Sequence, residues 1–215
     1  MLVTKFGHAC VRVEKDGARL VLDPGGLTDP GALDGADAVL VTHEHFDHFS
    51  EANLRRAAEE NPGLRIWTNA SVAARLDGLG GRVTAVGEGD AFDAAGFGVA
   101  VLGAWHEVIH PDIPRVANVG FLLDGVLFHP GDALTVPGSE VAVGTLLLPV
   151  HGPWSTTGRL IDYVREVAPD QVCGIHDGAL NDVGASMLAG LLGEQGPGTG
   201  SRYRRLGTGD TLAVG

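Results

Sequence analysis

Four candidate metal ligands lie within six residues of the sequence, in the segment 42–48, which reads Thr-His-Glu-His-Phe-Asp-His. The short apolar run 37–41 immediately before this segment has the length and composition of a buried strand. A loop this short can direct His43 and His45 to one side and Asp47 and His48 to the other, which suits two adjacent cations. The segment therefore constrains the fold, because the rest of the chain must bring further ligands to this loop.

Further candidate ligands lie where other apolar runs end. Residues 99–105 lead into His106, residues 126–131 lead into Asp132, and residues 172–175 lead into His176. Because the carboxyl ends of strands in α/β folds open on one rim, side chains far apart in sequence meet there. Each of these residues alone is a weak signal, but beside the histidine motif they are predicted to complete the metal site.

Short strands and helices alternate along the chain, and neither a repeat nor a linker marks an internal boundary. An antiparallel meander is expected over residues 2–23, with a type I′ turn at Asp16-Gly17. Ser50 is predicted to cap a helix that ends at 61–63, and Ser155 a helix that ends before Pro169. An apolar stripe over 183–192 predicts a core-facing helix. We therefore predict one domain covering residues 1–215.

Composition excludes several classes of protein. Acidic residues number 27 against 15 basic residues, and no dense basic block occurs, so nucleic acid is a poor partner. No apolar run approaches the length of a membrane span, and no secretory signal is visible at the start. Two cysteines, Cys10 and Cys173, cannot form a disulfide framework and are expected to be buried, inert thiols. A cytoplasmic location is expected, and the oligomeric state is left open.

The segment 42–48 resembles the metallo-β-lactamase superfamily, whose signature T/S-H-x-H-x-D-H it carries intact. The resemblance covers nearly the whole chain and implies an α+β fold, a four-layer αβ/βα sandwich with a dinuclear site between its halves. In the family's pattern the first cation is held by His43, His45 and His106, the second by Asp47, His48 and His176, and Asp132 bridges them.

A finer likeness rests on Gly7-His8-Ala9, Asp23-Pro24, the segment 128–132 and the small size, which look most like the branch that contains ascorbate-6-phosphate lactonase. The chain has no room for the extra helical region of glyoxalase II or for the large insertions of the processing nucleases. Flavodiiron proteins have a glutamate where this chain has His45. The resemblance therefore favours hydrolysis over redox chemistry.

Two cations among five neutral imidazoles and two carboxylates keep a net positive charge, which lowers the pKa of bound water and polarises a substrate oxygen. We expect a metal-bound hydroxide to cleave a small ester, lactone or amide, and an anionic small molecule would be attracted to the site. The ligand set suits Zn²⁺, with manganese and iron as alternatives. The candidate catalytic residues are Asp47, His151 and His110.

Two other functions share these ligands. A phosphodiesterase acting on a small phosphodiester would use the same metal site, and a metal-binding or sensing protein would keep the site without turnover. Of the remaining histidines, His8 and His129 are expected to have structural roles, with His8 supporting the metal loop.

Overall fold

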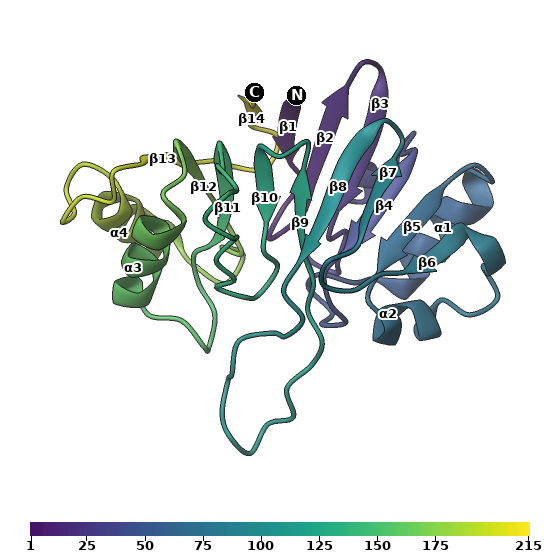
Figure 1. The fold of residues 1–215 in the computed structure, drawn as a ribbon, viewed down its shortest axis with the longest axis horizontal. Helices are drawn as coiled ribbons and strands as arrows, with labels where there is room; N and C mark the ends of the chain where they lie inside the picture. The colour runs from purple at the N-terminus through teal and green to yellow at the C-terminus, as the bar shows by residue number, and fades with distance from the viewer.

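The computed structural model describes residues 1–215 and contains two seven-stranded mixed sheets that face each other, with helices on both outer sides (Figure 1). In order across the first sheet, the strands are β14 (Thr211–Ala213), β1 (Leu2–Lys5), β2 (Val11–Lys15), β3 (Ala18–Leu22), β4 (Ala38–Val41), β5 (Arg65–Thr68) and β6 (Val83–Ala85). In order across the second sheet, they are β13 (Arg202–Arg205), β12 (Gln171–Ile175), β11 (Thr145–Pro149), β10 (Leu127–His129), β9 (Gly120–Leu123), β8 (Phe97–Leu102) and β7 (Ala91–Ala94).

Three apolar layers hold the two sheets and the helices together. The central layer joins the sheets and includes Leu40 of β4 and Leu147 of β11. An outer layer packs Val39 of β4 against α1 (Glu51–Glu60) and α2 (Ala70–Arg75), and another packs the second sheet against α3 (Thr157–Val167) and α4 (Asp182–Leu192). Because β4 is buried on both faces, its sequence is a continuous apolar run. The layer order α-β-β-α confirms the predicted four-layer sandwich.

Parallel strands in both sheets end on one rim of the molecule. The strands β3, β4, β5 and β6 pair in parallel, as do β10, β11, β12 and β13. The loops that follow β4, β10 and β12 leave from this rim, which lies at the bottom of Figure 1 beside the long loop after β8. The sheets therefore place three segments that are distant in sequence beside one another.

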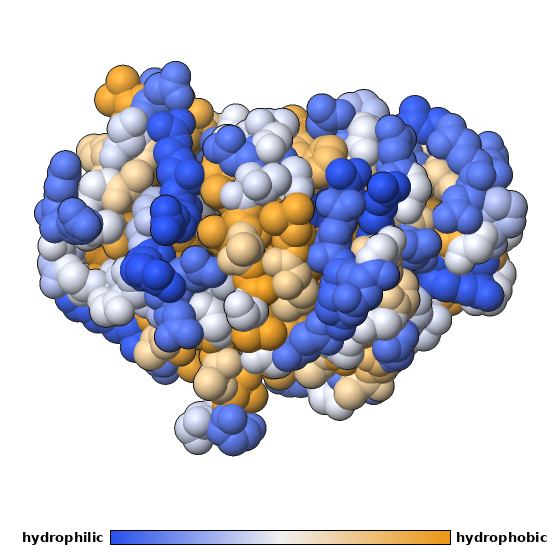
Figure 2. Space-filling model, turned by 90° about the horizontal axis from the view of Figure 1, so that it is seen from above, coloured by the Kyte–Doolittle hydropathy of each residue, from blue (hydrophilic) through white to orange (hydrophobic).

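The opposite end of the molecule carries both chain termini. Strand β1 pairs with β14 through Leu2 and Ala213, so the first and last strands are neighbours. Figure 2 views this end, where apolar side chains gather in the middle between hydrophilic flanks. No helix of the structure combines the length and the apolar character needed to cross a membrane.

Local signals placed several elements correctly. Asp16 and Gly17 both have positive φ, 52° and 87°, as a type I′ turn requires. The hydroxyl of Ser50 accepts a hydrogen bond from Asn53 N at 3.4 Å and caps α1 as expected. The predicted cap Ser155 is wrong by one residue, because the Thr156 hydroxyl accepts from Arg159 N and begins α3.

The prediction that the apolar stripe over 183–192 faces the core is confirmed only in part. Leu188 and Leu192 are buried, but Val183 is 77% exposed and Met187 is 62% exposed. The helix contacts α3 and the edge strand β13, so only part of its surface is covered. Strand β7, which forms a hairpin with β8, was not expected from the sequence.

The two cysteines are buried as expected. Cys10 and Cys173 have no exposed surface, and no disulfide joins them. Burial raises the pKa of the Cys173 thiol to about 12 and raises that of Cys10 further. Both side chains are therefore neutral packing residues near neutral pH.

Candidate metal centre

The histidine loop starts directly after β4 and is fixed by a buried aspartate. Thr42 donates two hydrogen bonds to Asp23, from its backbone N and from its hydroxyl, both at 2.7 Å. Asp23 has no exposed surface and adopts φ 49°. A Cβ at Gly25 would lie 2.1 Å from the carbonyl oxygen of Asp47, so only glycine allows this close approach. The end of β3 therefore determines the course of the loop after β4.

Four histidines turn the same ring nitrogen toward this rim. Because the Thr42 hydroxyl gives its proton to Asp23, it accepts from His43 Nδ1–H at 2.9 Å. His48 Nδ1 donates to Asp23 Oδ2 at 2.7 Å, and His106 Nδ1 donates to the carbonyl of Glu107 at 2.6 Å. His176 Nδ1 donates to the carbonyl of His151. With Nδ1 protonated, Nε2 of each neutral ring has a free lone pair.

Three of these four Nε2 atoms have no hydrogen-bonding partner in the protein, whereas His43 Nε2 lies 3.1 Å from His45 Nδ1. Nε2 of His48, His106 and His176 is buried and unpaired, and so is Oδ1 of Asp132. These atoms nevertheless lie close together: Asp132 Oδ1 is 3.2 Å from His48 Nε2, and Oδ2 is 3.3 Å from His106 Nε2 and 3.0 Å from His176 Nε2. Buried polar atoms without partners are rare in proteins and call for an explanation.

A divalent cation explains these distances. Donor atoms around one tetrahedral zinc ion lie about 3.3 Å apart, because each Zn–N bond is about 2.0–2.1 Å long. The imidazole and carboxylate donors are also of the type that zinc, manganese and iron accept. The side chains present therefore fit a metal centre.

The donors form two groups, within each of which the ligand atoms lie within 4.8 Å of one another. The first donor group consists of His43, His45, His106 and Asp132, and the second donor group consists of His8, Asp47, His48 and His176. The loop thus places His43 and His45 in one group and Asp47 and His48 in the other. Asp132 belongs to the first donor group by distance, but its oxygens also contact His48 and His176 of the second.

The backbone at Asp132 is held in place by the buried side chain of Asn118. The backbone N of Asp132 donates to Asn118 Oδ1 at 3.0 Å, and Asn118 Nδ2 donates to the carbonyl of Pro130 at 2.9 Å. Gly131 has φ 64°, and a Cβ there would lie 2.3 Å from Asn118 Oδ1. A glycine before Asp132 is therefore required by both backbone and space.

The pKa shifts of two histidines in the first donor group are opposite to those of two histidines in the second. Burial lowers the pKa of His43 well below its usual value and also lowers that of His45. Burial acts in the same direction on His48 and His176, but neighbouring carboxylates outweigh it. Asp132 and Asp23 raise the pKa of His48 well above its usual value, and Asp132 and Asp47 raise that of His176 to about 9.

Two residues predicted to be catalytic lie outside both groups. The His151 side chain is exposed, and its backbone carbonyl orients His176. His110 lies on the long loop after β8 with its side chain 60% exposed, and its Nδ1 accepts from Asp112 N at 3.1 Å. Neither imidazole contacts a candidate ligand, so their assignment as catalytic residues stays a prediction.

Asp23 is a functional residue to which the sequence assigned no role. It lies just past the apolar strand β3, the same position relative to a strand that marked the other ligands. Its carboxylate orients Thr42 and His48 together. A polar residue directly after an apolar strand is therefore a signal for carboxylates that orient metal ligands as well as for the ligands themselves.

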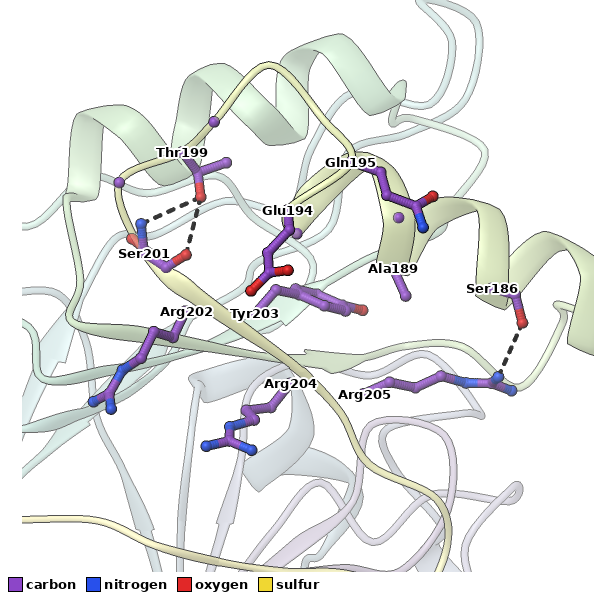
Figure 3. Close-up of a pocket in the computed structure, with 14 residues that line it drawn as sticks. Ser186, Ala189, Glu194, Gln195, Thr199, Ser201, Arg202, Tyr203, Arg204 and Arg205 are labelled. Carbon is purple, nitrogen blue, oxygen red and sulfur yellow. Dashed lines mark hydrogen bonds between the residues drawn. The ribbon is translucent and has the colours of Figure 1, made fainter.

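Cavities of the protein are not all related to this centre. A cavity of about 800 Å³ is lined by α4, β13 and the connection between them, including Glu194 and Tyr203 (Figure 3). None of the candidate ligands lines it. A small pocket beside the centre is lined by His45, His106, Arg115 and apolar side chains of the long loop. This small pocket therefore lies beside the first donor group.

The two donor groups on the shared rim of a four-layer sandwich define a hydrolase of the metallo-β-lactamase superfamily. The family described as "Beta-lactamase superfamily domain" matches residues 2–176, and the chain belongs to this family.

Similar proteins agree with this assignment. Protein Rv0786c of Mycobacterium tuberculosis is 37% identical over 182 residues, which cover 82% of this chain and 84% of that protein. A UPF0173 metal-dependent hydrolase of Nitratidesulfovibrio vulgaris is 27% identical over 177 residues, 73% of this chain and 71% of its own. Igni18, a metallo hydrolase of Ignicoccus hospitalis, shares the fold with a TM-score of 0.69 at 21% identity, over 98% of this chain and 97% of its own.

Proposed function

We propose that the chain is a dinuclear metal-dependent hydrolase that cleaves a small ester, lactone or amide. The observation that carries this proposal is the set of buried, unpaired Nε2 atoms of His48, His106 and His176 around the carboxylate of Asp132. The names of the UPF0173 relatives, which describe metal-dependent hydrolases, support the same class of reaction.

Each donor group would hold one divalent cation, with Zn²⁺ as the proposed ion. The first cation is assigned to His43, His45 and His106, the second to Asp47, His48 and His176, and Asp132 to both. Asp132 is suited to this shared position because its two oxygens face nitrogens of both groups. Bound divalent cations supply a water of lowered pKa as nucleophile and polarise the substrate oxygen.

The protein's own residues provide orientation around this chemistry. Asp23 and Thr42 fix the ring planes of His43 and His48, and two backbone carbonyls fix those of His106 and His176. Such partners of metal ligands determine which ring nitrogen is free and how the ring is turned. The centre is therefore preorganised before substrate arrives.

Arg115 supports a substrate that carries an anionic group. It lines the small pocket beside His45 and His106, and its Nε donates to the carbonyl of His106. Val108 and Ile113 on the same loop are about half exposed, at 52% and 48%, and offer apolar contact. We propose that His110 and His151 contact substrate or transfer protons.

A substrate panel tests the proposal. The protein loaded with Zn²⁺ should hydrolyse at least one member of a panel of lactones, aryl esters and amides, and Asp132→Ala should abolish that activity. Elemental analysis of the purified protein should give two cations per chain. Faster hydrolysis of a bis-aryl phosphate than of every carbonyl compound would assign a phosphodiesterase instead. Full loading with two cations and no turnover would favour a binding or sensing protein.

A further inference from the structure

His8 differs from the other histidines of the centre in its hydrogen bonds. It lies in the turn between β1 and β2 and is 4% exposed. Its Nδ1 accepts a hydrogen bond from Gly178 N at 2.9 Å, whereas His48, His106 and His176 donate from Nδ1. A backbone N–H can only donate, so Nδ1 of His8 carries no proton, and the proton of the neutral ring is on Nε2.

This tautomer excludes His8 as a ligand, although it lies within the second donor group. Nε2 of His8 is 3.1 Å from Asp47 Oδ2 and donates its proton to that oxygen. A protonated ring nitrogen has no lone pair for a cation, and the lone pair of Nδ1 is taken by Gly178. Both nitrogens of the ring are therefore committed to the protein.

His8 also contacts the second donor group through its backbone. Its carbonyl accepts a hydrogen bond from His176 N at 2.8 Å. A Cβ at Gly178 would lie 2.8 Å from His8 Nδ1, so the segment after His176 packs directly on the ring. One residue thus joins the turn after β1 to the loops that carry Asp47 and His176.

We propose that His8 is a positioning residue for the second cation: its Nε2–H holds the Asp47 carboxylate, whose Oδ2 also lies 3.4 Å from His176 Nε2, in the orientation that the metal requires. This inference rests on the proposed dinuclear centre. Removal of the hydrogen bond should lower the affinity for the second cation and leave the affinity for the first unchanged. Loss of such a partner of a metal ligand typically lowers metal affinity by about 10–100-fold.

Two amide substitutions separate this role from that of a ligand. In His8→Gln the amide nitrogen replaces Nε2 and still donates to Asp47. In His8→Asn the amide oxygen replaces Nδ1 and still accepts from Gly178, but the donor to Asp47 is lost. Neither amide nitrogen can bind a cation. A positioning role therefore predicts that His8→Gln retains the second cation within a few-fold and that His8→Asn and His8→Ala do not.

The experiment is a calorimetric titration of the metal-free protein and these variants with Zn²⁺ alone. The expected result is two binding events in the wild type and in His8→Gln, with the weaker event further weakened by about 10–100-fold in His8→Asn. Equal weakening in His8→Gln and His8→Asn would assign His8 as a ligand and overturn the inference. Unchanged binding in His8→Asn would also overturn it.

Further measurements keep the inference testable if a variant at position 8 fails to fold. Gly178→Ala would displace the ring without changing it and should weaken the same binding event. In the zinc-loaded wild type, the nitrogen chemical shifts of His8 should identify the Nε2–H tautomer, and an Nδ1–H tautomer would overturn the proposal. Fewer than two cations bound by the wild type would instead contradict the dinuclear function itself.

Discussion

The two donor groups share one rim but differ in the charge that they carry before a cation binds. In the first, burial lowers the pKa values of His43 and His45, so these rings are neutral near pH 7. In the second, adjacent carboxylates overcome burial and raise the pKa values of His48 and His176. The difference arises because Asp23, Asp47 and Asp132 all approach the second group.

This difference in protonation predicts the order in which the two groups would bind cations. A cation binds neutral imidazole, so His43 and His45 of the first group accept one without losing protons, whereas the second group must release the protons of His48 and His176. In the metal-free protein, the carboxylates stabilise the protonated forms of His48 and His176. The same carboxylates would compensate the charge of a bound cation. The first group is therefore expected to fill first, and the second to depend on pH.

The largest effect is expected from Asp132→Ala, because this carboxylate touches both groups. The variant should lose tight binding of both cations and at least about 100-fold of any hydrolytic activity. Metal content after dialysis and initial rates measure the effect. Asp162→Ala, which removes an 80% exposed carboxylate on α3, is the matched control and should behave as wild type. If Asp132→Ala bound as much metal as the wild type, the assignment of Asp132 as a ligand shared by both cations would be wrong.

Single ligand substitutions should separate the two groups. His43→Ala is expected to lose the first cation, and His176→Ala the second, because each removes a nitrogen from only one group. Elemental analysis of the dialysed variants should give about one cation per chain in each. Retention of both cations in either variant would contradict the assignment of that residue.

The pH dependence of binding should differ between the groups. Zn²⁺ affinity of the second group should rise by up to about tenfold per pH unit for each proton released, until pH passes the His176 pKa of about 9. Affinity of the first group should change little above pH 7. Titrations in two buffers of different ionisation enthalpy count the protons released. Equal proton release in both binding events would contradict the predicted difference in protonation between the two groups.

A smaller effect is expected on the stability of the metal-free protein. The pKa of His176 is raised from 6.5 to about 9 on folding, so its stabilising contribution is complete below pH 6.5 and is lost as pH rises through 9. The free energy of unfolding should fall by about 1–3 kcal/mol over this interval. Urea denaturation in the presence of a chelator measures it. His176→Asn should flatten the profile, and an unchanged slope in that variant would assign the effect to another group.

The rim and most of its donors could be predicted from the sequence, because ligands follow apolar strands. The run before His43 and the runs before Asp132 and His176 are buried strands whose carboxyl ends meet in space. The family resemblance added the four-layer architecture, which local patterns alone do not specify. The closer likeness to ascorbate-6-phosphate lactonase stays a prediction.

Other features depend on contacts that the sequence does not display. The His8 ring is oriented by Gly178, which lies 170 residues away, and no local pattern reveals this bond. The apolar stripe of α4 indicated burial, but the helix lies at the edge of the second sheet, where nothing covers Val183. The protonation state of a histidine likewise depends on how many carboxylates surround its ring after folding. Because the motif does not display these neighbours, the histidines of the two groups look alike in the sequence.

The pairing of β1 with β14 has a practical consequence. The amino group of Met1 donates to the carbonyl of Val214 at 2.6 Å, and both ends lie on the side of the molecule away from the donor loops (Figure 1). An affinity tag, a fluorescent fusion or an attachment to a sensor surface at either terminus would leave the opening of the centre free. A short peptide joining the two ends would likewise permit circular permutation, with new termini cut at an exposed hairpin.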